Sequence, residues 1–212
     1  MKPGRPAPGG VYAKKLYFCA LLLSIMKSNK KLIWSLVVMV IVAAVYRVIP
    51  DRPLGFAPQM AIALFSGAMI KDRKLAFLFP VLSMLISDLL YQGLYAAGMS
   101  PYGGFYGGMW INYLLFTSVT VFGMMIKKVN LKNVLAASLA GPTFFFLLSN
   151  FLTWAGVGDY VEYPKTWEGL MACYAAGIPF YKGSLMATVA FSGLFFGTWY
   201  LLGKRETKTA VA

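Results

Sequence analysis

The chain has 212 residues, of which 59% are hydrophobic and 13% are charged, and its formal net charge is +13. Soluble proteins carry about 25% charged residues, so the composition excludes an ordinary water-soluble globule and indicates an integral membrane protein. The 20 Lys and Arg residues stand in small groups between apolar runs and form no long basic block, which argues against a nucleic-acid partner.

The first 25 residues do not fit a membrane span. Their apolar run, Leu16–Ile25, has ten residues, whereas a spanning helix needs about 20. The run resembles the hydrophobic part of a signal peptide, but no small-residue cleavage site follows it. We expect residues 1–25 to be an extension upstream of a natural start at Met26; the alternative is an interfacial amphipathic helix. Residues 26–212 then form a single transmembrane domain.

Six apolar runs follow, separated by short connectors. They are continuous and do not alternate with polar residues, so they predict helices and disfavour a membrane β-barrel. Most reach the length needed to cross a hydrocarbon core of about 30 Å, although the second is short. The predicted fold is an all-α integral membrane protein with a bundle of six transmembrane helices, at Leu32–Val48, Phe56–Ile70, Leu75–Tyr95, Met109–Ile126, Val134–Trp154 and Ser184–Leu202.

Two further segments lie between these runs. Leu170–Phe180 is apolar but only about three helical turns long, and Pro179 and Gly183 separate it from the last span. We expect it to lie at the membrane interface or to pack on the bundle. The connector 98–108 is rich in glycine but lacks the Lys and Ser/Thr of a phosphate-binding loop, so we expect a mobile outer loop.

The basic residues predict the orientation, because Lys and Arg near spans are retained in the cytoplasm. On the outer side this places Arg47, Arg52, Lys165 and Lys182. Both termini are then cytoplasmic, and the protein is a multi-pass protein of the bacterial cytoplasmic (inner) membrane, in contact with the lipid bilayer. Twelve basic residues lie on the cytoplasmic side: Lys27, Lys30, Lys31, Lys71, Arg73, Lys74, Lys127, Lys128, Lys132, Lys204, Arg205 and Lys208.

Polar side chains gather in the outer half of the predicted bundle. Asp88 is the only acidic residue inside a span and lies about 20 Å across the membrane from the start of its helix. Polar groups in lipid are costly and normally face the protein interior or a wet cavity. We therefore predict an outward-facing pocket for a small solute. Its candidate binding residues are Asp88, Asn112, Asn150, Gln59, Trp154 and Tyr91.

Each of these residues also has a structural interpretation. Asp88 can form an ion pair with Arg47 or Arg52, or accept hydrogen bonds from Asn112 or a backbone amide, and so fasten helices without binding a solute. Gln59 and Asn150 can serve as hydrogen bonds between helices in the same way. The aromatic residues can belong to the interfacial belt of Trp and Tyr, which includes Trp154, Tyr91, Trp110, Tyr95, Tyr113 and Tyr160.

The residue types needed for enzyme chemistry are scarce. The sequence has no histidine, and Cys19 and Cys173 have no paired spacing, so no metal site is expected. No pair of nucleophile and base is visible, and no cofactor motif is present. We therefore expect a protein that is not an enzyme and that has no cofactor.

Short motifs between Lys31 and Leu202 resemble a known family. In order they are Phe56-Ala57-Pro58, Phe79-Pro80, Ser87-Asp88-Leu89-Leu90, Ser149-Asn150-Phe151 and Tyr163-Pro164-Lys165-Thr166. They resemble an uncharacterised family of bacterial membrane proteins regarded as relatives of the substrate-binding S components of energy-coupling factor (ECF) transporters. Where that family often places an Asp near the start of the last span, this chain has Met186-Ala187-Thr188.

The resemblance implies a six-helix fold with an outward-facing site for a vitamin or ion. It also implies two kinds of partner, a transmembrane coupling subunit and ATPases, because the chain has no ATPase motif of its own. The sequence thus predicts a solute-binding subunit for uptake, with Asp88 orienting the solute. The alternative is a structural or accessory subunit of a larger membrane complex, with no solute-binding role.

Overall fold

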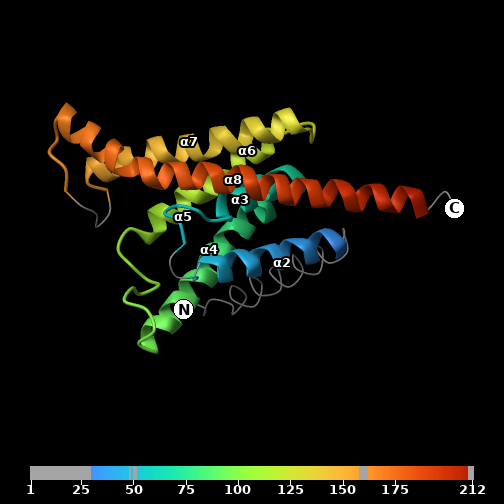
Figure 1. Cartoon of the computed structure of the whole chain (residues 1–212), viewed down its shortest axis with the longest axis horizontal. Helices are drawn as coiled ribbons and strands as arrows, with labels where there is room; N and C mark the ends of the chain where they lie inside the picture. Colours follow the sequence, from blue (N-terminus) through green and yellow to red (C-terminus); the bar gives the residue numbers. More distant parts are fainter. Residues whose placement is uncertain (1–29, 48, 50–51, 158–161, 210–212) are drawn as a thin grey trace, which may run out of the picture. The chain divides into compact units, whose positions relative to one another are not determined.

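A computed structural model describes residues 30–47, 49, 52–157 and 162–209 (Figure 1). The predicted extension, residues 1–25, lies outside the described residues. The chain divides into two compact units, Met1–Val38 and Met39–Ala212. Of the first unit, the described residues are the beginning of helix α2, and the second unit contains the remaining helices.

Every regular element of the described residues is a helix, as the continuous apolar runs predict. Three helices are long and apolar enough to cross a membrane: α4, α7 and residues 167–201 of α8. The shorter apolar helices include α3 and the pair formed by α5 and α6. In chain order the helices are α2 (Lys30–Arg47), α3 (Gln59–Met69), α4 (Arg73–Ala96), α5 (Met109–Ser118), α6 (Thr120–Met124), α7 (Leu131–Ala155) and α8 (Trp167–Thr209).

The helix boundaries follow from capping residues. The Asp72 carboxylate accepts from the backbone N–H of Lys74 at 2.9 Å and starts α4, and the Asn130 side chain caps α7 in the same way. Helix α7 ends at Gly156, whose φ of 81° is a left-handed conformation that glycine adopts without strain. These caps lie within four residues of the ends predicted from hydropathy.

Helix α3 lies at the centre of the second unit. Nine consecutive residues, Gln59–Gly67, are buried, so the helix is enclosed on all sides. It contacts α4, α5, α6, α7 and α8. A Cβ atom at Gly67 would overlap with the carbonyl oxygen of Thr120, and one at Gly123 would overlap with that of Leu64. Glycine at both positions therefore allows the backbones of α3 and α6 to touch.

Helix α8 corrects one sequence prediction. The stretch Leu170–Phe180 is not a separate interfacial segment, because α8 runs unbroken from Trp167 through Pro179 and Gly183. A proline in a helix removes one backbone hydrogen bond, and packing against a neighbour offsets this cost. Helices α7 and α8 lie side by side in Figure 1, where they are yellow-orange and red. The Phe146 ring of α7 stacks on the Tyr181 ring of α8 at 4.6 Å, two residues after the proline.

Candidate functional site

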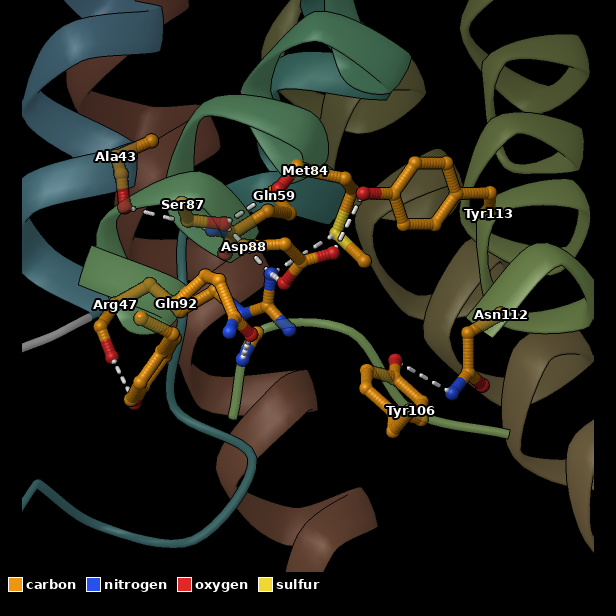
Figure 2. A network of polar contacts seen from close by, with 12 residues as sticks. Ala43, Arg47, Gln59, Met84, Ser87, Asp88, Gln92, Tyr106, Asn112 and Tyr113 are labelled. Atoms are coloured by element: carbon orange, nitrogen blue, oxygen red, sulfur yellow. Dashed lines mark hydrogen bonds and ion pairs between the residues drawn. The ribbon is translucent and has the colours of Figure 1, made fainter. Parts of the chain in front are cut away.

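Asp88 lies at the centre of a buried polar network, and both of its carboxylate oxygens are occupied (Figure 2). The side chain is 1% exposed. Oδ1 accepts from Arg47 Nη1 at 2.5 Å, and Oδ2 accepts from the Tyr113 hydroxyl at 2.5 Å. The ion pair that the sequence offered as an alternative is therefore formed, with Arg47 as the partner. Asp88 links the C-terminal end of α2 to α4 and to the start of α5.

Arg47 is held in place by several groups besides Asp88. The same Nη1 atom donates to the Ser87 hydroxyl at 2.6 Å and lies 3.9 Å from the Met84 sulfur. The Arg47 carbonyl accepts from the Tyr91 hydroxyl at 2.7 Å, and the Tyr91 ring lies 5.9 Å from the guanidinium carbon. The guanidinium plane is thus fixed against α4 on two sides.

Arg52 does not pair with Asp88. Its Nε donates to the carbonyl of Arg47 at 2.9 Å, and its Nη1 donates to the carbonyl of Phe56 at 3.4 Å. Both acceptors are backbone groups, so the positive charge of Arg52 meets no carboxylate among the described residues. The two bonds hold the guanidinium at the start of the connector between α2 and α3.

Gln59, the first residue of α3, is 2% exposed. Its Nε2 donates to the carbonyl of Ala43 at 3.4 Å, which fastens α3 to α2. The Oε1 atom is buried and has no hydrogen-bond partner among the described residues. An unsatisfied buried acceptor is costly and is an unusual feature that a bound donor could relieve.

Asn112 lies close to this network but is not a partner of Asp88. Its Nδ2 donates to the Tyr106 hydroxyl at 3.0 Å, and Figure 2 shows the pair apart from the carboxylate. The next residue, Tyr113, reaches Asp88 instead, because successive side chains on a helix differ in direction by about 100°. The proposed hydrogen bond from Asn112 to Asp88 is therefore not formed.

A large cavity opens beside the network. It has a volume of about 890 Å³, and we call it the arginine cavity. Three of the six predicted binding residues contribute to its wall, namely Gln59, Tyr91 and Asn112. Asp88 does not, because it lies behind Arg47 and borders an adjoining hollow of about 740 Å³. The other lining residues include Arg47, Arg52, Ala57, Met60, Met84, Leu94, Met99, Tyr102, Tyr106, Phe116, Phe145 and Phe180.

Asn150 lines a second, smaller cavity of about 390 Å³ between α5, α7 and α8. Its Nδ2 donates to the carbonyl of Phe146 at 2.8 Å, and its side chain lies so close to Gly177 that a Cβ there would overlap with it. Asn150 thus contributes to packing between α7 and α8. The two cavities adjoin, since Asn112, Phe145, Phe180 and Ser184 line both.

Trp154 lines neither cavity. Its Nε1 donates to the carbonyl of Pro164 at 2.9 Å, and its ring lies 5.7 Å from the Lys165 ammonium, which also donates to the Trp154 carbonyl. The Tyr163-Pro164-Lys165-Thr166 motif is therefore fastened to the end of α7. Trp154 positions this connector and does not join the other predicted site residues.

The glycine-rich connector contains one position fixed by close packing. The Gly104 N–H donates to Gln92 Oε1 at 3.1 Å, and a Cβ at Gly104 would overlap with the carbonyl oxygen of Asp88. This segment therefore lies directly on the α4 backbone beside the polar network. Sequence reasoning explained the glycines by mobility, whereas close approach explains Gly104.

The comparison with protein families gives one match. A model described as a family of unknown function, DUF6580, covers residues 27–210 of the chain. The protein is a member of the DUF6580 family. No curated protein and no solved structure matched the chain.

Within the described part of this DUF6580 protein, Asp88 is the one charged residue that is buried. Sequence reasoning identified Asp88 and named Arg47 as a possible partner, but it assigned Tyr113 to the interfacial belt. A lone carboxylate in a span needs a second donor as well as a cation, and Tyr113 is the nearest hydroxyl along the next helix. The need of the Asp88 carboxylate for a second hydrogen-bond donor is the signal that could have identified Tyr113. Groups of three or more metal-ligating side chains are absent from the described part of this DUF6580 protein.

Proposed function

We propose that this protein is a membrane subunit that binds a small solute for uptake, in the manner of an S component. The observation that carries the proposal is the arginine cavity. Its volume of about 890 Å³ lies within the range of about 300–1,000 Å³ that is usual for small-molecule sites. Its wall combines many apolar side chains with a few polar ones from distant parts of the chain, which is the composition expected of such a site.

In this proposal six helices cross the bacterial cytoplasmic membrane, and the cavity faces outwards. The cavity residues include the C-terminal ends of α2 and α4, the N-terminal ends of α3 and α5 and the connectors that follow α2 and α4, and residues of α7 and α8 complete the wall. Exposed basic residues lie at the opposite helix ends: Lys71 in the connector after α3, Arg73 and Lys74 in the first turn of α4, and Lys127 and Lys128 after α6. The rule that basic residues stay in the cytoplasm supports this orientation, with both termini inside.

Energy for uptake would come from partners. By the resemblance to ECF S components, these are a transmembrane coupling subunit and ATPases. Cysteine labelling in intact cells tests the orientation, after Cys19 and Cys173 are replaced by alanine. A membrane-impermeant maleimide should label a cysteine at Glu162 and spare one at Asp72, and labelling in the opposite pattern would contradict the topology.

The solute-binding role is tested by ligand capture. The protein, purified in a mild detergent, is dialysed against a small-molecule extract of bacterial cells, and retained compounds are identified by mass spectrometry. Ala57→Phe fills part of the arginine cavity and should abolish retention. Ala176→Phe makes the same change on an exposed part of α8 and should have no effect. Retention of no compound by the wild-type protein would reject the proposal.

A second candidate is a structural or accessory subunit, and the polar network favours it. Both Asp88 oxygens are engaged within the protein, and Gln59 and Asn150 each bond to backbone carbonyls. Such bonds fasten helices without any solute. Copurification with other membrane subunits, together with failure to retain any compound, would favour this candidate.

A further inference from the structure

We propose that the arginine cavity binds a small organic anion, whose oxyanion group meets the free guanidinium N–H groups of Arg52 and Arg47. The inference rests on the proposed solute-binding function and specifies the class of solute. It differs from the expectation drawn from the sequence, in which Asp88 orients the solute.

The charges around the cavity support an anion. Among the described lining residues, Arg47 and Arg52 are charged, and neither Asp nor Glu contributes to the wall. Asp88 lies behind Arg47, and each of its oxygens already accepts a short hydrogen bond. The pair of Arg47 and Asp88 has no net charge, so Arg52 leaves one positive charge at the described wall.

The N–H groups of Arg47 and Arg52 that have no acceptor among the described residues are also suited to bind an anion. A guanidinium has five N–H donors in a rigid fork that matches carboxylate and phosphate groups. Arg52 uses Nε and Nη1 for backbone carbonyls, and its Nη2 has no acceptor among the described residues. Arg47 uses Nη1 for Asp88, Ser87 and Met84, which leaves its Nε and Nη2. The hydrogen bonds that both guanidinium groups make within the protein hold them in position before a solute binds.

The rest of the wall indicates that the anion has an apolar body. Methionine and aromatic residues make up nine of the twenty described lining residues besides the two arginines, and a bare inorganic ion would leave their surface in contact with water. Methionine adapts to irregular apolar shapes, and aromatic faces stack on planar groups. The residues concerned are Met60, Met84, Met99, Phe116, Phe145 and Phe180.

An oxyanion could also come from the phosphate of a membrane lipid, since arginine near a membrane surface binds such groups. The cavity argues for a water-soluble anion, because its wall includes the polar groups of Gln59, Ser100 and Asn112 as well as apolar ones. The Oε1 atom of Gln59 has no partner among the described residues. A solute that carries a donor as well as the oxyanion would satisfy Gln59 Oε1, whereas lipid chains would not.

Charge-fractionated capture tests the inference. The small-molecule extract is separated by ion exchange into anionic, neutral and cationic fractions, and the protein is dialysed against each. We expect the anionic fraction alone to yield retained compounds. Arg52→Gln should weaken their retention about tenfold or more, because the loss of a hydrogen bond to a charged group has this effect on affinity. Arg52→Lys keeps the charge but loses the fork, so we expect an intermediate effect.

The control is Lys182→Gln, which removes an exposed positive charge that does not line the cavity. It should leave retention unchanged, and melting temperatures without added compounds show whether each variant is folded. Retention from the neutral or cationic fraction only, retention of a phospholipid only, or equal retention by wild type and a folded Arg52→Gln would overturn the inference. The first of these results would leave the solute-binding proposal standing, whereas retention from no fraction would reject both.

Discussion

Replacing Asp88 with Asn tests whether the buried network stabilises the fold. The change keeps the size and shape of the side chain but removes its negative charge. Asp88 is 1% exposed, and its two oxygens accept from Arg47 and Tyr113 at 2.5 Å each. After the substitution Arg47 keeps the Ser87 hydroxyl as an acceptor, and the amide oxygen can replace Oδ1, but the guanidinium loses its counter-charge. We therefore expect Asp88→Asn to lower the stability of the protein.

The size of the effect follows from the burial of the pair. Breaking a fully buried ion pair costs about 3–5 kcal/mol. The Arg47 side chain is 16% exposed and borders the arginine cavity, so water can solvate part of its charge and reduce the cost. We expect a loss of about 3 kcal/mol in the free energy of unfolding. For a chain of this length that corresponds to a fall of roughly 6–12 °C in melting temperature.

The assay is thermal unfolding in detergent, with Asp72→Asn as the matched control. Asp72 is the exposed N-cap of α4, and Asn caps a helix about as well as Asp, so the control should change the melting temperature by about 1 °C at most. The double variant Arg47→Met with Asp88→Asn removes the stranded cation and should regain part of the loss. A melting temperature of Asp88→Asn within about 2 °C of the control would refute the reasoning.

Three other changes are expected to have measurable effects on the same melting temperature or on insertion. Gly104→Ala should lower the melting temperature by several degrees, because its Cβ would overlap with a backbone oxygen of α4. The control is Gly93→Ala, which should leave the melting temperature unchanged or raise it, because no atom lies within 4 Å of the new Cβ. Trp154→Phe should cost about 1 kcal/mol through loss of the hydrogen bond to Pro164, and an unchanged melting temperature would show that this bond adds nothing. A chain that begins at Met26 should insert and melt like the full chain, which membrane fractionation and thermal unfolding can check.

The sequence predicted helices well where apolar runs are long. The predicted span Leu75–Tyr95 agrees with α4, and Val134–Trp154 agrees with α7, because a continuous apolar run has one stable form in lipid. The prediction from sequence was wrong at Pro179, where the proline was interpreted as the end of a helical segment. Contacts between α7 and α8 maintain the helix there, and such contacts between distant residues are not visible in local sequence.

The candidate site was predicted less completely, for a geometric reason. Counting residues along a helix gives the depth of a side chain in the membrane but not the direction in which it points. Depth placed Asp88 and Asn112 at similar levels, yet Tyr113 is the residue that faces Asp88. The choice between Arg47 and Arg52 likewise depends on how the connector folds after α2.

The enclosure of α3 has a consequence for how the protein is made. Its 11 residues extend about 16 Å, roughly half of the hydrocarbon thickness, so lipid alone cannot stabilise it as an independent span. Its glycine contact with α6 forms only after a later part of the chain has been synthesised. The stability of α3 therefore depends on helices that follow it in the chain, and α3 is expected to reach its final position only after α6 has been made.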